Sequence, residues 1–279
     1  MTETTTAAKE IEYHPKWGGY ANLPPVPGWF GKNYWARATS LAKVLDDTYN
    51  LTQWKLRQVA LGIKMEPTVL DLISDRVKPD SKAGKEILNA VAARALEVSG
   101  SHDGADRGTA LHDLAEELDA TGMVPVGADV LQAQTLVAYS NGLRREGIEI
   151  LPEYTERVVV CPSLGVAGRL DRIVRDQDGD LKIGDLKSQK WEPGAYDSMA
   201  LSIQLAIYAN ATHILDHESW TWEAMPKVSR KEGLIFWIPS TKPGAFEIYD
   251  VDLVQGAKFA RAAKALKEWR YQNLTVTKR

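Results

Sequence analysis

Two aspartates and a lysine flank a turn signal near the middle of this chain. Asp171 precedes the pair Asp178-Gly179, and Asp185 and Lys187 follow it. Asp-Gly between two apolar runs is a strong signal for a tight hairpin, so Asp171 is expected to lie opposite Asp185. Side chains alternate along a strand, which places Asp185 and Lys187 on one face. The sequence therefore predicts a cluster of two carboxylates and one ammonium group.

Such a cluster suits metal-dependent hydrolysis of a phosphodiester bond. Like charges at short range raise the pKa of one carboxylate, and a divalent cation relieves that repulsion. Oxygen ligands of this kind favour magnesium or manganese. A lysine beside them can orient the attacking water or offset the charge that develops on the phosphate. Asp-x-Lys also occurs on solvent-exposed strands, so the interpretation of this motif as an active site depends on the surrounding strands and helices.

Three sequential antiparallel strands are expected around these residues, since short β-branched runs alternate with Gly, Pro and Asp. They cover about 158–160, 166–174 and 181–186. Upstream, Thr109 is expected to cap a helix that carries His112 in its first turn and Glu116 one turn later. A downstream helix carries Gln204 and Tyr208, also one turn apart. The predicted strands and helices would thus bring polar side chains together from four elements.

Taken in order, these motifs resemble one known family. Gly-Thr-x-x-His on a helix, Gly-x-x-Asp and Asp-x-Lys on successive strands, and Gln-x-x-x-Tyr on the next helix are similar to the RecB-type exonuclease branch of the PD-(D/E)XK nuclease superfamily. Within that branch the chain looks most similar to bacteriophage exonucleases related to the CRISPR-associated spacer-acquisition nuclease. The resemblance implies an α/β fold, in which a central mixed sheet is flanked by helices and preceded by an N-terminal helical extension.

By position, the resemblance also implies a metal site. His112, Asp171 and Asp185 would be side-chain ligands, the backbone carbonyl of Leu186 would be a further ligand, and Lys187 would be the catalytic lysine. One or two Mg²⁺ or Mn²⁺ ions are expected at this site.

Three further residues follow from the same resemblance. Glu156 would be an auxiliary ligand or would position the attacking water, with Glu153 as its rival. Gln204 and Tyr208 would face the DNA backbone or steady the strands of the active site.

Positively charged side chains recur near these positions, and Arg107 and Lys190 are expected to contact DNA. The wider set is Arg107, Arg169, Arg172, Lys182, Lys187, Lys190, Lys227, Arg230 and Lys231. Either they line a groove that follows phosphates, with salt-dependent binding, or they belong to a mixed-charge surface. The net charge of −3 includes the carboxylates of the site, so the local distribution matters more than the sum.

The chain has a single cysteine, Cys161. It therefore cannot form an intramolecular disulfide or the four-cysteine iron–sulfur cluster that the spacer-acquisition nucleases hold, so no such cluster is expected. The N-terminus has neither the basic start nor the apolar core of a secretory signal, and no run approaches the ~20 apolar residues of a membrane span. We expect no membrane association and a cytoplasmic location, in the host cell if the chain is phage-encoded.

A chain of 279 residues, 44% of them hydrophobic, can bury one substantial core with helical additions. An irregular N-terminal segment is expected over 1–31, a helical extension over 32–105, and a nuclease core with a closing C-terminal helix over 106–279. The last two are expected to form one compact unit. Helices are predicted over 38–61, 83–98, 128–145 and 253–270, and later strands over 220–224, 233–238 and 246–251.

The function expected from these residues is a divalent-metal-dependent DNA exonuclease that acts in phage recombination or DNA end processing. DNA would be its substrate, and a single-strand annealing protein is a partner by family analogy. A structure-specific endonuclease would use the same site geometry and is the nearest alternative. A non-catalytic nucleic-acid-binding protein on this fold is another, but such a protein would be expected to have lost Asp171, Asp185 or Lys187. Oligomeric state and cleavage polarity stay open.

Overall fold

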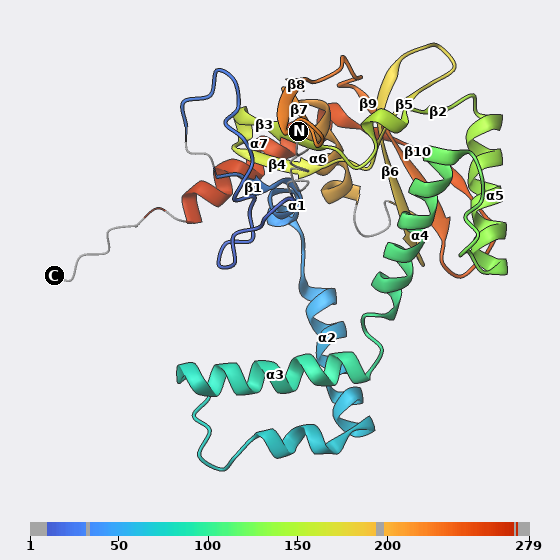
Figure 1. The fold of residues 1–279 in the computed structure, drawn as a ribbon. Coiled ribbons are helices and arrows are strands. Elements are labelled where there is room, and N and C mark those ends of the chain that lie inside the picture. The colour runs from blue at the N-terminus through green and yellow to red at the C-terminus, as the bar shows by residue number, and fades with distance from the viewer. Residues whose placement is uncertain (1–9, 32–33, 194–197, 271, 273–279) are drawn as a thin grey trace, which may run out of the picture. The chain divides into compact units, whose positions relative to one another are not determined.

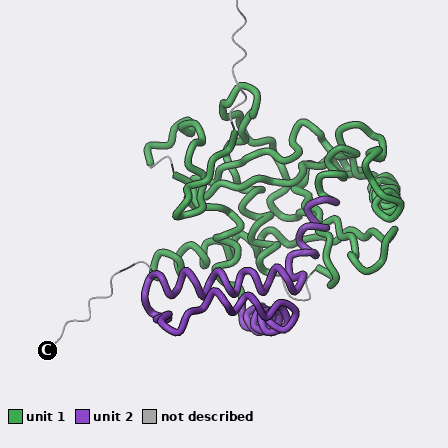
Figure 2. Tube along the Cα trace, turned by 60° about the horizontal axis from the view of Figure 1, so that its bottom comes forward, with its two compact units in different colours: residues 1–46, 112–279 green, residues 47–111 purple. Residues whose placement is uncertain are grey.

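A computed structural model describes residues 10–31, 34–193, 198–270 and 272 of the protein. The start of the predicted N-terminal segment, residues 1–9, lies outside the described residues. The chain divides into two compact units, one from Met1–Asp46 and His112–Arg279 and the other from Asp47–Leu111 (Figure 2). The segment boundaries predicted at 31 and 105, and the single compact unit expected from 32–279, stay a prediction.

The smaller unit is helical. It contains α2 (Tyr49–Met65), a 3₁₀ turn at Pro67–Leu72, α3 (Lys82–Val98) and the first part of α4 (Asp103–Thr121). Gly62 lets α2 approach α3 closely, because a Cβ there would lie 1.8 Å from the carbonyl oxygen of Ala95. The Ser81 side chain caps α3 by accepting a hydrogen bond from Gly84 N–H at 3.0 Å.

Two helix predictions in this part of the chain need correction. The helix predicted over 38–61 is divided into α1 (Ala38–Ala42), a 3₁₀ turn at Lys43–Leu45 and α2. Thr109 does not cap a helix, because α4 already begins at Asp103 and the Thr109 hydroxyl donates to the Ala105 carbonyl at 3.1 Å. Asp103 and Asp106 supply the acidic first turn that favours this earlier start. His112 therefore lies in the middle of α4.

The larger unit contains two mixed five-stranded sheets with helices around them (Figure 1). The first sheet has the strand order β1 (Ala36–Arg37), β4 (Val166–Arg169), β3 (Val158–Cys161), β7 (His213–Asp216) and β8 (Thr221–Ala224). The second sheet has the order β10 (Glu247–Asp252), β9 (Glu232–Pro239), β6 (Leu181–Gln189), β5 (Arg172–Arg175) and β2 (Glu149–Ile150). The predicted α/β class is confirmed, with the strands divided between two sheets instead of one.

The strand predicted over 166–174 is in fact two strands. β4 pairs with β3 in the first sheet, whereas β5 pairs with β6 in the second. At the break, Leu170 N–H donates to the Arg157 carbonyl and Glu156 N–H donates to the Asp171 carbonyl, each at 3.0 Å. Asp171 therefore lies at the junction between the two sheets.

The β5–β6 hairpin forms where the Asp-Gly signal predicted it. Gly179 has a φ of +88°, a left-handed conformation that glycine adopts without steric cost. In the ladder Arg172 pairs with Gly184 and Ile173 with Ile183. Continuing that register by one residue brings Asp171 opposite Asp185, as the sequence predicted.

The helix α6 (Ser198–Ala209) lies in the main hydrophobic core. Leu205 and Ile207 are buried together with Val159 of the first sheet and Ile183 of the second. A helix that is apolar over most of its surface, as α6 is, is typical of such a buried position. The long helix α7 (Leu253–Arg270) packs on α6 through Gly256, where a Cβ would lie 2.1 Å from the Ser202 carbonyl oxygen.

The helix α5 (Val130–Arg145) packs on the second sheet and begins with a capping box between Asp129 and Gln132. Tyr139 on α5 makes an edge contact with Phe236 on β9, with ring centroids 6.2 Å apart. None of the helices in the described part of the chain has the length and hydropathy of a membrane span.

The N-terminal segment covers the outer face of the first sheet. Tyr20, Leu23 and Trp35 are buried against Val158 and Val160 of β3. The Trp222 indole N–H on β8 also donates to the Pro24 carbonyl at 2.9 Å, which fixes the middle of the segment to the sheet.

The strand β7 was not among the predicted strands, and neither were the two-residue strands β1 and β2. β7 begins at His213 and pairs with β3 through Val160. The short run of four residues gives too few alternations for the strand period to stand out from the preceding helix.

Candidate metal centre

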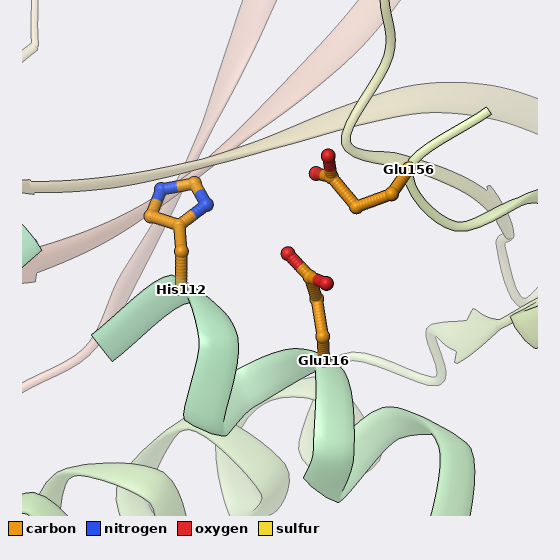
Figure 3. A group of neighbouring side chains, drawn as sticks. All are labelled: His112, Glu116 and Glu156. Carbon is orange, nitrogen blue, oxygen red and sulfur yellow. The ribbon is translucent and has the colours of Figure 1, made fainter. Parts of the chain in front are cut away.

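His112 and Glu116 lie one turn apart on α4 and point towards Glu156, which precedes β3 (Figure 3). Ligand atoms from these three side chains all lie within 4.8 Å of one another. Glu156 has a φ of +53°, which is uncommon for a residue other than glycine. Its backbone is held there by the hydrogen bond from Glu156 N–H to the Asp171 carbonyl. Strained backbone of this kind is concentrated at functional sites.

Asp171 lies beside this group. Its Oδ2 is 3.7 Å from His112 Nδ1 and accepts a hydrogen bond from Leu186 N–H at 3.0 Å. The His112 Nε2 atom lies 2.6 Å from the Leu186 carbonyl oxygen. That contact is a hydrogen bond when Nε2 carries the proton, which leaves the lone pair of Nδ1 on the Asp171 side for a cation.

Asp185 and Lys187 form a close pair on β6. Asp185 is fully buried, and its Oδ2 lies 2.5 Å from Lys187 Nζ. Its Oδ1 accepts a hydrogen bond from Gln204 Nε2 at 3.2 Å. Burial and the neighbouring Asp171 raise the pKa of Asp185, while Lys187 acts in the opposite direction. The predicted side chains of β6 and α6 are thus in direct contact.

The electrostatics of the group fit a cation. Burial, together with the charges of Asp171 and Glu116, raises the pKa of Glu156 from 4.5 to about 8. Burial also raises the pKa of Glu116 and lowers that of His112, which favours the neutral imidazole that binds metals. Several crowded carboxyl groups and one neutral imidazole form a donor set suited to Mg²⁺ or Mn²⁺.

A buried ion pair connects two of the elements that carry the candidate ligands. Arg172 Nε lies 2.6 Å from Asp119 Oδ2, and the Tyr139 hydroxyl donates to Asp119 Oδ1 at 3.0 Å. Arg172 directly follows Asp171, and Asp119 lies on α4 one turn beyond Glu116. The pair therefore connects the two elements that carry the candidate ligands.

The sequence did not identify two of these residues. Glu116 was placed on the same helix face as His112 but was not assigned as a ligand, and Asp119 was not singled out. The signal for both is their spacing, since residues at i, i+4 and i+7 from His112 share one helix face.

The other predicted residues lie outside the group formed by His112, Glu116 and Glu156. Glu153, the rival of Glu156, is exposed, and its backbone carbonyl accepts a hydrogen bond from Arg157. Tyr208 is 1% exposed and packs on Gly168, where a Cβ would lie 2.5 Å from the tyrosine ring. This position suits the role of steadying the strands and not the role of facing DNA. Gln204 reaches the site through Asp185.

The two predicted DNA-contacting cations are both exposed. Lys190 follows β6, and its Nζ lies 4.8 Å from the ring centroid of Trp191. Arg107 lies on the part of α4 that belongs to the smaller unit. Their contact with DNA stays a prediction.

Comparison with known proteins agrees with the geometry. A sequence model of the PD-(D/E)XK nuclease superfamily matches residues 131–272, about half of the chain. The chain belongs to the PD-(D/E)XK nuclease superfamily. The matched region contains Glu156, Asp171, Asp185 and Lys187 and begins after the two candidate ligands on α4. PD-(D/E)XK nucleases use divalent metal ions, and the described residues include an acidic and histidine cluster that fits one.

No curated protein matches the chain. Thirteen chains of solved structures do match, among them one described as the crystal structure of SSO0001. That chain is 15% identical, with 81% of this chain and 88% of that chain covered, and has a TM-score of 0.28. At this TM-score the likeness adds nothing to the family assignment.

Proposed function

We propose that this PD-(D/E)XK protein is a DNA exonuclease of the RecB type that requires Mg²⁺ or Mn²⁺. One observation carries the proposal: the Asp185–Lys187 pair lies on the strand opposite Asp171, and Asp171 contacts His112. The Asp-x-Lys motif therefore lies next to a group of candidate metal ligands and not on a solvent-exposed strand.

The residues that would hold the metal come from four segments. His112 and Glu116 project from α4, Glu156 precedes β3, and Asp171 lies at the junction of the sheets. Asp185 adds a further carboxylate from β6. A divalent cation bound there would polarise the scissile phosphate and lower the pKa of a water molecule.

The other catalytic and positioning roles would belong to side chains and backbone groups of β6 and α6. Lys187 would orient the attacking water and offset negative charge that develops on the phosphate. Its pairing with Asp185 fixes the position of the ammonium group. Gln204 holds the other oxygen of Asp185, and Leu186 N–H holds Asp171. These contacts orient the reacting groups before the substrate binds.

The sequence resemblance favours an exonuclease in phage recombination or DNA end processing, working beside a single-strand annealing protein. A structure-specific endonuclease would share the same centre and is the second candidate. A non-catalytic binding protein is disfavoured, because Asp171, Asp185 and Lys187 are all present and in register.

The test uses duplex DNA of one sequence as an end-labelled linear molecule and as a closed circle. Each is incubated with the purified protein and Mg²⁺, Mn²⁺ or EDTA. An exonuclease degrades only the linear form and only with metal, and the label released first gives the polarity. Cutting of the circle would favour the endonuclease, and intact DNA in every reaction would contradict nuclease function.

A further inference from the structure

Arg169 is the last residue of β4 and lies two residues before Asp171. In the ladder it pairs with Val158 of β3, so the two side chains lie on the same face of the first sheet. Val158 is buried against the N-terminal segment, whereas 45% of the Arg169 side chain is exposed. The N-terminal segment therefore covers this face of the sheet but leaves Arg169 accessible at the end next to Glu156.

The guanidinium of Arg169 lies beside one of the candidate ligands. Its Nη1 atom is 3.6 Å from Glu156 Oε2, and Glu156 points towards His112 and Glu116 (Figure 3). This distance is longer than a hydrogen bond. In the part of the chain that the structure describes, the guanidinium donates no hydrogen bond, so its N–H groups are available to another acceptor.

The two other arginines near the junction of the sheets are already engaged in the fold. Arg157 donates hydrogen bonds to two backbone carbonyls, at 2.6 Å and 2.8 Å. Arg172 is fully buried and is paired with Asp119. Of these three arginines, Arg169 alone combines an exposed side chain with a guanidinium that makes no hydrogen bond.

A phosphate that approaches the metal centre needs positive charge around it. The carboxyl groups of the candidate ligands repel it, and Lys187 is already paired with Asp185. Arg169 supplies a further positive charge on the Glu156 side of the group. A guanidinium also matches the geometry of phosphate, because two of its N–H groups can donate in parallel to two oxygens.

We propose that Arg169 is a catalytic residue that binds the phosphate cleaved at the metal centre. Two of its N–H groups donate to non-bridging oxygens, and its charge offsets the negative charge that develops on them. The phosphate replaces the long contact with Glu156. The inference rests on the proposed function, because a substrate phosphate reaches Arg169 only if DNA binds at the metal centre.

The alternative is a structural role, in which Arg169 only holds Glu156 in place. The two roles predict different changes in metal affinity. If Arg169 holds Glu156, its removal lowers the affinity for Mn²⁺. If Arg169 binds the phosphate, its removal leaves that affinity unchanged or raises it, because a positive charge 3.6 Å from a ligand repels the cation.

Arg169→Gln keeps most of the arginine stem and removes the charge. Single-turnover cleavage of linear duplex DNA with Mn²⁺ should slow about tenfold or more, while the Mn²⁺ affinity from titration calorimetry should not fall. Arg169→Lys restores the charge without the planar donors and should recover part of the rate. Thermal melting checks that each variant retains the fold.

The phosphate contact is also measured without cleavage. Lys187→Ala, which should cleave slowly, is compared with Lys187→Ala/Arg169→Gln by fluorescence anisotropy on labelled duplex DNA with Mn²⁺. Loss of one phosphate contact should raise Kd about fivefold or more and lower the salt slope by about 0.9. Arg175→Gln in the same background is the matched control and should change neither, because Arg175 is a similarly exposed strand residue paired with a glutamate at the turn end of β5.

The outcomes separate this inference from the proposed function. An unchanged salt slope on removal of Arg169 would overturn the inference, even if the protein cleaves DNA. A loss of Mn²⁺ affinity as steep as the loss of rate would show that Arg169 only positions Glu156, which also overturns it. If the wild type cleaves no DNA but Arg169→Gln still lowers the salt slope, the nuclease is contradicted and the phosphate contact is supported.

Discussion

The carboxylate of Asp119 and the guanidinium of Arg172 form a buried ion pair between α4 and β5. Their Oδ2 and Nε atoms lie 2.6 Å apart, and the two side chains are 4% and 0% exposed. Asp119 follows Glu116 by one turn, and Arg172 follows Asp171 directly. One contact therefore sets the distance between two ligand-bearing elements that are far apart in the sequence.

Removing one partner of this pair should destabilise the fold strongly. Asp119→Ala leaves the Arg172 charge buried without its counter-ion, and we expect the free energy of unfolding to fall by about 3–5 kcal/mol. The double variant Asp119→Leu/Arg172→Met removes both charges and should recover most of that loss. Urea unfolding measures both. A loss below about 1 kcal/mol for Asp119→Ala would show that the pair does not hold the helix to the strand.

Glu116 should contribute to metal binding. Glu116→Gln keeps the size of the side chain but removes a negative charge from the group with His112 and Glu156. We expect the affinity for Mn²⁺ to fall at least about tenfold, as measured by titration calorimetry. Glu117→Gln, on the exposed side of the same helix, is the control and should bind as the wild type does. Equal affinities for the two variants would remove Glu116 from the site.

His112 should be needed for the same affinity. His112→Ala removes the Nδ1 atom that lies 3.7 Å from Asp171 Oδ2. We expect the cleavage rate to saturate only at a higher Mg²⁺ concentration. An unchanged metal dependence would mean that His112 is only a packing residue of α4.

Lys187 should act on the chemical step. Lys187→Ala removes the ammonium group but leaves His112, Glu116, Glu156 and Asp171 in place, so single-turnover cleavage should slow about 100-fold or more while Mn²⁺ affinity changes little. If the affinity for Mn²⁺ falls as steeply as the rate, Lys187 organises the ligands and the proposed role is wrong.

The stabilisation that a metal provides should depend on pH. The pKa of Glu156 is about 8 in the folded protein, above its usual 4.5, so the metal-free fold retains a proton that the unfolded chain releases. The stability that protonated Glu156 contributes to the metal-free fold is fully present below about pH 4.5 and is lost as the pH rises towards 8. A bound cation replaces the proton, so Mg²⁺ should raise Tm more at pH 8.5 than at pH 5.5.

The corresponding control is Glu156→Gln, which has no proton to lose. In this variant the difference between the two Mg²⁺-induced Tm shifts should become smaller. A shift that is larger at pH 5.5 in the wild type would contradict the assignment of Glu156 to the metal site.

Local signals in the sequence were enough for several elements of the fold. The Asp178-Gly179 turn set the β5–β6 register, and the periodicity of 253–270 predicted α7 with its observed ends. The division of 166–174 into β4 and β5 was not predictable from periodicity. Both halves have β-branched residues, and only their pairing with β3 and β6 decides that they belong to different sheets.

The candidate site was predictable where spacing within one element carried the information. Asp185 and Lys187 on one strand, and His112 and Glu116 on one helix, needed only the strand and helix periods. The pairing of Asp119 with Arg172 joins residues 53 positions apart and depends on how α4 packs on the second sheet. No local sequence pattern encodes such a contact, so this ion pair could be identified only from the three-dimensional structure.

The most direct test of the metal-dependent nuclease compares the wild type with Asp185→Asn. The amide has nearly the same shape as the buried carboxylate but cannot carry its charge, so the fold should be retained and Tm should change little. We expect the wild type to release label from end-labelled linear DNA with Mg²⁺ and not with EDTA, and the variant to be about 1,000-fold slower. Full activity in Asp185→Asn, or wild-type activity that persists in EDTA, would contradict the account.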